Sequence, residues 1–309
     1  MAANTQVDVL GLGVAAVDDL FFVHSYPVPD TKVRVSRKER HGGGLTATAL
    51  VAAARLGSTC AYAGALGSDE LSAFAREGLR AEGVDLSWVS NREDASPIHA
   101  TVIVDMAAHT RTILLHGEGI CGAVPNWPPE EVITRPRVLF VDYVGLEGVL
   151  RAARIASRAG IPIVADAEGG SGAQHGELMH LVDHLIVTSE YASRATGRED
   201  PGEAVVALWH EGRQAVVATC GKAGAWYVDA TAPDRPRHQR AFSVSVVDTT
   251  GCGDVFHGAY ASGLARGLDM AGRMQLASAA AALKATRAGG QSGAPTLAEV
   301  EAFLREAGL

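Results

Sequence analysis

The chain has 309 residues, of which 47% are hydrophobic and 20% charged, and its formal net charge at pH 7 is −8. These values exclude a disordered chain and indicate a soluble globular enzyme, built as one large α/β domain or two smaller ones. The acidic balance argues against nucleic acid as a partner, because phosphate binding needs a clustered basic face. No apolar run approaches the ~18 residues that a membrane span needs.

Cysteine usage predicts where the protein works. The four cysteines lie far apart and form no C-x-x-C pair. This spacing argues against a zinc site and against a disulfide framework, and it predicts a reducing, cytoplasmic location.

The first part of the chain predicts strands and helices around a β-rich excursion. Residues 7–14 are typical of a buried strand that runs into a glycine turn, and residues 18–40 of short extended pieces interrupted by prolines. A helix over 47–56, a strand over 60–64 and a helix from 68 to 83 follow. A second β-region is predicted over 98–115 from its alternating apolar residues.

From residue 137 onward, buried strands alternate with helices. The predicted strands cover 138–141, 161–164, 184–187, 214–219, 225–228 and 242–247, and the predicted helices cover 150–159, 255–266 and 270–286, with a last helix that opens at a capping box on Thr296. Such alternation predicts a parallel sheet covered on both faces. We therefore expect a doubly wound αβα sandwich, as a single domain over 1–309. A small β-sheet lid would be formed by residues of about 18–40 and 97–117.

The segment 248–254 carries the strongest chemical signal. It reads Asp-Thr-Thr-Gly-Cys-Gly-Asp and joins a predicted strand to a predicted helix. Backbone N–H groups therefore converge at a helix N-terminus, which is a favourable place for an anion. A hydroxyl group that attacks a γ-phosphate must lose a proton, so we expect Asp254, beside this anion site, to be the general base. The alternative is that Asp254 only caps the helix.

Three segments together resemble the ribokinase (pfkB) family of carbohydrate kinases. Residues 248–254 are similar to its C-terminal signature D-T-x-G-A-G-D. Residues 42–57 and 64–69 are similar to its N-terminal glycine-rich signature, and residues 280–295 to its closing segment. The resemblance covers nearly the whole chain in the right order, which is far more specific than any one motif.

The resemblance implies a role for each matching residue. Asp254 matches the catalytic base, and the anion hole for the transferred phosphoryl group matches Gly251, Cys252 and Gly253. The ATP-binding residues would be Thr219, Gly221, Gly224 and Gly289. The substrate-binding residues would be Asp18, Gly43, Gly44 and Thr48. Asp248 and Thr250 match a monovalent cation site for K⁺, and Mg²⁺ would arrive with ATP.

The chain also departs from the family pattern. Thr48 stands where many relatives have asparagine, and Gly293 replaces a serine near the cation site, which leaves the K⁺ dependence open. The N-x-x-E motif that organises Mg²⁺ is not recognisable, and Glu190 is the candidate substitute. Cys252 replaces the alanine of the family pattern. A thiol at a helix N-terminus can have a lowered pKa and be reactive. The plainer interpretation is that cysteine is simply small enough for this position.

Two branches of the family resemble the chain most. Residues 26–27 and 111–116 are similar to ketohexokinases. Residues 247–258 and 281–290 are similar to bacterial sulfofructose kinases, and Lys32 of this chain matches a lysine that contacts the sulfonate group in those enzymes. We expect transfer of the γ-phosphate of ATP to a primary hydroxyl of a ketose or related sugar. Sulfofructose and adenosine-type nucleosides remain alternatives, as does a non-catalytic sugar or nucleotide sensor. A homodimer is expected through the lid, along an edge that carries residues 21–23.

Overall fold

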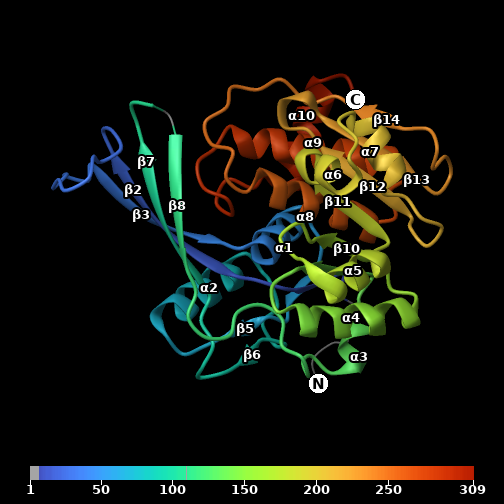
Figure 1. Ribbon diagram of the computed structural model, residues 1–309, viewed down its shortest axis with the longest axis horizontal. Coiled ribbons are helices and arrows are strands. Elements are labelled where there is room, and N and C mark those ends of the chain that lie inside the picture. Colours follow the sequence, from blue (N-terminus) through green and yellow to red (C-terminus); the bar gives the residue numbers. More distant parts are fainter. Residues whose placement is uncertain (1–6, 109) are drawn as a thin grey trace.

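The computed structural model describes residues 7–108 and 110–309, and its main element is an eight-stranded sheet (Figure 1). The strand order is β14-β13-β12-β11-β10-β9-β1-β4, in which β12 to β4 are parallel and β13 and β14 are antiparallel additions. In chain order these strands are β1 (Val9–Leu12), β4 (Cys60–Tyr62), β9 (Val138–Asp142), β10 (Ile163–Asp166), β11 (His184–Thr188), β12 (Ala215–Thr219), β13 (Ala225–Asp229) and β14 (Arg237–Gln239).

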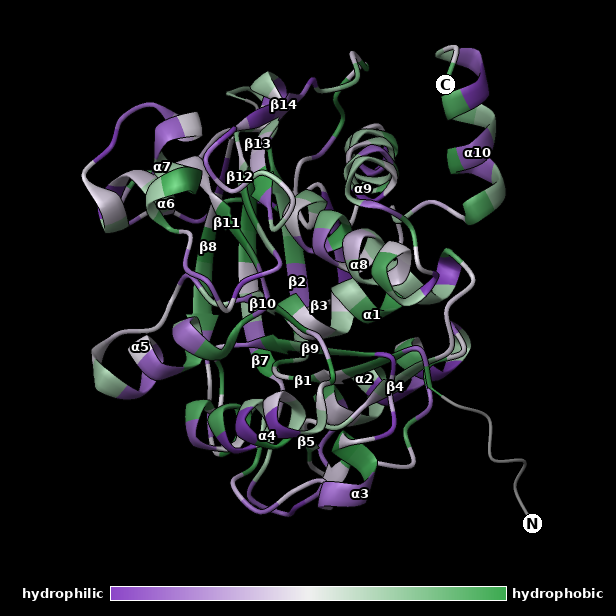
Figure 2. Cartoon of the chain, turned by 90° about the vertical axis from the view of Figure 1, so that its right-hand side faces the viewer, coloured by the Kyte–Doolittle hydropathy of each residue, from purple (hydrophilic) through white to green (hydrophobic). Residues whose placement is uncertain are grey.

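Helices cover both faces of this sheet, and Figure 2 shows α8 and α9 on one side and α4 on the other. One face packs against α1 (Leu45–Arg55), α8 (Cys252–Ala265), α9 (Met270–Ala285) and α10 (Leu297–Glu306). The other face packs against α3 (Glu130–Ile133), α4 (Leu146–Ala159), α5 (Gly172–Leu181), α6 (Ser189–Thr196) and α7 (Pro201–Ala207).

Strand β9 shows why the predicted strands read as continuous apolar runs. Val138 and Phe140 are buried in one core cluster, whereas Leu139 and Val141 are buried in the other. Successive side chains of a strand point to opposite faces, so a strand covered on both faces must be apolar at every position. The doubly wound αβα sandwich predicted from the sequence is therefore confirmed.

A second sheet of four strands projects from one side of the main body (Figure 1). Its order is β3-β2-β7-β8, with bounds β2 (Ala16–Val23), β3 (Arg37–Gly43), β7 (Ile98–Asp105) and β8 (Thr110–His116). Helix α2 (Glu70–Ala81) contacts β2 and β3, and a short sheet joins β5 (Ala65–Leu66) to β6 (Ser90–Asn91). The side chain of Asp19 on β2 is buried and binds Arg40 and His99 from both neighbouring strands.

Three expectations differ from the structure. Residues 242–247 form no strand; they are irregular, with Val246 and Val247 exposed. Residues 21–23 do not lie on a sheet edge, because β2 is hydrogen-bonded to β3 on one side and β7 on the other. Helix α2 is capped by Asp69, whose side chain accepts from the Ser72 N–H, so this helix begins after residue 68.

No helix among the described residues is long and apolar enough to cross a membrane.

Candidate active site

The expected anion hole lies at the N-terminus of α8. Gly251 is the N-cap residue with φ of 74°, and a Cβ added there would lie 2.7 Å from the Cα of Gly290, so the turn requires glycine. Among the described residues, no acceptor binds the backbone N–H of Gly251, Gly253 or Asp254. The N–H of Cys252 instead donates to the carbonyl of Thr249 at 3.2 Å. Three free N–H groups at a helix N-terminus suit a phosphoryl group.

Asp254 lies in the first turn of α8, directly after these amides. Burial raises its pKa well above the usual value, and the nearby carboxyl groups of Asp166, Asp142 and Asp18 raise it further. The charge of Lys284 acts in the opposite direction. A carboxyl group with a raised pKa is a stronger base when ionised, which suits a group that must accept a proton from an alcohol.

Asp142, the last residue of β9, connects several segments near the site through its carboxylate. Its carboxylate accepts hydrogen bonds from the Val14 N–H at 2.7 Å, the Thr46 hydroxyl at 2.8 Å and the Val144 N–H at 2.7 Å. Burial raises the pKa of Asp142 to about 6 despite these bonds. Because the carboxylate joins the segments after β1 and β9 to α1, we interpret Asp142 as a structural support of the site.

The residues expected to bind sugar lie on β2, β3 and α1. A Cβ on Gly43 would lie 2.6 Å from a carboxylate oxygen of Asp18, so these two residues are in direct proximity. Gly44, with φ of 93°, begins α1, and a Cβ there would lie 2.6 Å from the Val14 carbonyl oxygen. Burial raises the pKa of Asp18, and the charges of His41 and His99 oppose that rise.

Thr48 is the sugar-binding candidate with the clearest signal. Its hydroxyl oxygen is buried and has no hydrogen-bond partner among the described residues. A Cβ on Gly251 would lie 3.6 Å from its methyl carbon, so Thr48 lies next to the catalytic loop. A buried hydroxyl without a partner is costly unless a ligand completes it.

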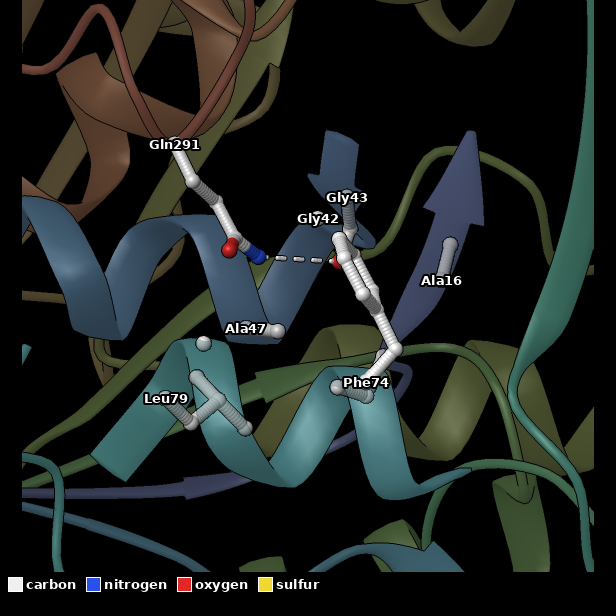
Figure 3. A pocket seen from close by; sticks show the side chains of 10 residues that line it. Ala16, Gly42, Gly43, Ala47, Phe74, Leu79 and Gln291 are labelled. Carbon is white, nitrogen blue, oxygen red and sulfur yellow. Dashed lines mark hydrogen bonds between the residues drawn. The ribbon is translucent and has the colours of Figure 1, made fainter. Parts of the chain in front are cut away.

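Two hollows lie in the protein, and the smaller one touches the sugar-binding candidates only at Gly43. This cavity of about 60 Å³ lies between Phe74, Gly43 and Gln291, and the side-chain amide of Gln291 donates to the Gly43 carbonyl at 3.1 Å (Figure 3). It is smaller than the ~300 Å³ of a typical ligand pocket. A larger hollow of about 650 Å³ is lined by Pro162 and Asp183, next to the starts of β10 and β11, at the opposite edge of the sheet.

The expected nucleotide-binding residues follow β12. The Thr219 hydroxyl donates to the Val187 carbonyl at 3.3 Å, and a short 3₁₀ turn, η1 (Gly221–Ala223), follows. Gly221 and Gly224 have φ of 53° and 94°. This turn lies at the carboxyl edge of the parallel strands, the edge at which open α/β sheets bind ligands.

The magnesium candidate Glu190 is exposed, and its carboxylate accepts from Ser189 at 3.3 Å. A different carboxylate occupies this neighbourhood: Glu168 accepts hydrogen bonds from the backbone N–H and the hydroxyl of Thr188. In the part of the chain that is described, no cluster of three or more His, Cys, Asp or Glu residues could hold a metal ion.

The cation candidate Asp248 is surrounded by donors. It accepts from the Thr250 N–H at 2.8 Å and the Gly289 N–H at 2.9 Å, and the ammonium group of Lys284 lies 3.5 Å from one of its oxygens. Although burial alone raises the pKa of Asp248, these bonds and the Lys284 charge hold it below the usual value. Sequence analysis alone did not indicate that Lys284 belongs to the site.

One residue differs from expectation, and the role of Lys32 stays a prediction. Burial raises the pKa of the Cys252 thiol, so the lowered pKa considered for a helix N-terminus is wrong. Lys32 is exposed in the segment that joins β2 to β3, and Figure 1 shows the far end of these strands pointing away from the main body.

Arg111 on β8 connects the second sheet to the catalytic loop. Its guanidinium lies 3.9 Å from the carboxylate of Asp248, and 40% of the side chain is exposed. The sequence placed Arg111 only in a segment similar to ketohexokinases and not in the site.

Comparison with known proteins agrees with this geometry. A family model described as pfkB family carbohydrate kinase matches residues 8–297. The ribokinase of Staphylococcus aureus (strain COL) is 26% identical over 306 residues, which cover 94% of this chain and 98% of that protein.

Solved structures share the whole fold. A crystal structure from Agrobacterium tumefaciens, provisionally described as a ribokinase, has a TM-score of 0.90 and 29% identity, and covers 98% of each chain. Arabidopsis thaliana ribokinase, complexed with ribose and ATP, has a TM-score of 0.85 and 22% identity, and covers 97% of this chain and 99% of its own. The chain therefore belongs to the pfkB family of carbohydrate kinases and is an ATP-dependent phosphotransferase that acts on a sugar hydroxyl.

Proposed function

We propose that this kinase transfers the γ-phosphate of ATP to a primary hydroxyl group of an uncharged sugar, either ribose or a ketose. The observation that carries the proposal is the position of Asp254, whose carboxyl group follows three unpaired backbone amides at the start of α8. A base and an anion site side by side are what in-line phosphoryl transfer to an alcohol requires.

In the proposed reaction, the sugar oxygen attacks the γ-phosphorus while its proton passes to Asp254. The bond between the sugar oxygen and phosphorus forms, and the bond from phosphorus to the β-phosphate oxygen breaks, so that ADP leaves. The N–H groups of Gly251 and Gly253 would bind the oxygens of the transferred group, and Thr219, Gly221 and Gly224 would hold the nucleotide. Bound Mg²⁺ would neutralise charge on the phosphates.

Charge favours a neutral substrate over a sulfonated or phosphorylated one. The largest charge effects on Asp254 come from three carboxyl groups, Asp166, Asp142 and Asp18, and from the cation Lys284. That cation already binds backbone carbonyls. An anionic sugar beside three carboxylates would be repelled by several of them at once. A sulfofructose kinase or an adenosine-type nucleoside kinase remains the alternative.

We also propose that the second sheet acts as a lid over the sugar. It carries Asp18 and Gly43 from β2 and β3, and Arg111 from β8 reaches toward Asp248. Closure over the substrate would exclude water, which otherwise competes with the sugar for the phosphoryl group.

A homodimer is proposed through the outer edge of β8. This strand ends the second sheet, and Ile113, Leu114 and Leu115 are 47%, 53% and 71% exposed. An apolar edge strand is a template for pairing with a second copy. Light scattering should give twice the 32.1 kDa of one chain, and Leu115→Asp should halve that mass. A monomeric wild type would contradict the dimer.

The test of the function is ADP release from Mg-ATP with a panel of sugars. We expect a high kcat/KM for ribose or one ketose and a much lower value for sulfofructose, ribose 1-phosphate and adenosine. A preference for a sulfonated or phosphorylated sugar would contradict the neutral-substrate argument. Absence of turnover on the whole panel, with ATP still bound, would favour the sensor.

A further inference from the structure

Lys284 is a fully buried lysine whose ammonium group binds the catalytic loop from behind. It is on α9, and its side chain has no exposed surface. The ammonium group donates to the carbonyl of Asp248 at 2.8 Å and to the carbonyl of Arg287 at 3.1 Å, and lies 3.5 Å from the Asp248 carboxylate. Lysine is rarely buried completely unless its charge is paired, and here one carboxylate and two carbonyls pair it.

The neighbouring residues do not fit an additional monovalent cation. The resemblance to the family assigns such a cation to Asp248, the carbonyl of Thr250 and the region of Gly289, and the Lys284 ammonium already contacts oxygens of Asp248 and Arg287. The two carboxylate oxygens of Asp248 accept hydrogen bonds from the N–H groups of Thr250 and Gly289. A second positive charge at hydrogen-bond distance from the ammonium group would be repelled.

The glycine at 293 is required by the backbone of Gly289, and Lys284 adds to the crowding. A Cβ added to Gly293 would lie 2.6 Å from the Gly289 carbonyl oxygen and 3.1 Å from the Cε of Lys284. The carbonyl and the lysine side chain therefore both border the space that a serine side chain would need at 293. Compared with the family pattern, the chain therefore lacks both the serine hydroxyl at 293 that could bind the ion and the space in which the ion would lie.

We propose that the ε-ammonium group of Lys284 is a built-in replacement for the monovalent cation, so that turnover does not depend on K⁺. Lys284 is a positioning residue. By binding the carbonyls of Asp248 and Arg287 it joins the loop before α8 to the segment after α9, and it fixes the backbone that presents the N–H groups of Gly251 and Gly253. Its charge also reaches the site: burial raises the pKa of Asp254 and Cys252, and Lys284 opposes the rise at both.

The first experiment measures wild-type turnover and thermal unfolding in K⁺ and in tetramethylammonium, at constant ionic strength and without other alkali ions. We expect the same kcat and the same Tm in both salts. A manyfold rise of kcat with K⁺, or a Tm raised by K⁺ but not by tetramethylammonium, would overturn the proposal.

The second experiment removes the ammonium group with Lys284→Ala, which also leaves space for an ion. In tetramethylammonium we expect kcat to fall by roughly 10²-fold, because a displaced anion hole costs about that much, with KM for ATP changed less. Potassium should restore most of the kcat and raise the Tm. Lys284→Met, which fills the space with an uncharged chain, should show the loss without the rescue.

The matched control is Arg287→Ala, which removes a charge from the same segment. The Arg287 side chain is 37% exposed and pairs with Glu299, away from the ammonium group. This variant should show no response to K⁺. A folded Lys284→Ala protein that is fully active without K⁺, or is inactive in every salt, would show that the lysine does not substitute for a cation.

The inference uses the family activity, and the two can fail separately. If the proposed substrate is wrong, the wild type is inactive on the panel in all salts, and the Tm comparison of wild type and Lys284→Ala still tests the lysine. If the lysine proposal is wrong, the wild type is active and responds to K⁺.

Discussion

Replacement of Gly253 by alanine should separate stability from activity. Gly253 is exposed at the second position of α8 and has no positive φ, and a Cβ added there meets no atom within 4 Å. Alanine is about 0.5–1 kcal/mol more favourable than glycine within a helix. The free energy of unfolding should therefore stay equal or rise by up to about 1 kcal/mol.

The same methyl group should impair phosphoryl transfer. Cα–Cβ bonds of a helix tilt toward its N-terminus, so the methyl group would point toward the space in which the phosphoryl group is proposed to lie. Misplacement of the reacting group by about 1 Å can cost about 10² in kcat. We expect a loss of this size at an unchanged Kd for the sugar.

Urea unfolding and steady-state kinetics measure the two effects, with Gly176→Ala as the matched control. Gly176 is an exposed helical glycine of α5 that likewise has no atom near its added Cβ. It should give the same gain in stability with wild-type kcat. A Gly253→Ala enzyme that keeps full kcat would refute the assignment of this space to the transferred group.

Three further predictions concern ionisation and the sugar contact. The raised pKa of Asp254 means that the base is protonated, and kcat/KM lost, as pH falls through a value well above the usual 3.8, and a pH–rate profile with an acidic limb near 4 would contradict it. The hydrogen bond from Arg40 lowers the pKa of Asp19 from 3.8 to about 2. This pair therefore stabilises the fold above pH 4, and the stabilisation is lost as pH falls toward 2. In urea unfolding, Asp19→Asn should be less stable than the wild type by about 2 kcal/mol at neutral pH and equally stable at about pH 2. Thr48→Val removes a hydroxyl that has no partner, so KM for the sugar should rise several-fold while the Tm stays within about 2 °C, and an unchanged KM would remove Thr48 from the sugar site.

The main sheet could be predicted from the sequence because its strands are buried on both faces. Leu139 and Phe140 belong to different cores, so β9 is apolar at every position and is easily recognised. The segment 242–247 looks similar but forms no strand: Val247 is exposed, and its N–H donates to the carbonyl of Ala285, the last residue of α9. Tertiary contacts decide such a segment, and the local pattern does not contain them.

The loop 248–254 could be recognised in the sequence because its proposed function is local. The glycines, the helix start and Asp254 are adjacent in the chain, and general rules for helix ends explain their use. Lys284 is 36 residues from Asp248 and lies in an alanine-rich helix, where a lysine is normally solvated. Its role depends on packing between α9 and the loop, which no local pattern contains. The same holds for Asp142, whose bond to Val14 spans 128 residues.

The measurement that tests the central claim most directly is Asp254→Asn with the best sugar of the panel. Removing the base should lower kcat by about 10²–10⁴, while calorimetry shows ATP and sugar bound with Kd values close to those of the wild type. Stability should not fall, because burial disfavours the ionised carboxyl group that the substitution removes. If kcat of the variant falls by less than about tenfold, the loss is smaller than the contribution expected of a general base. That result would contradict the assignment of Asp254.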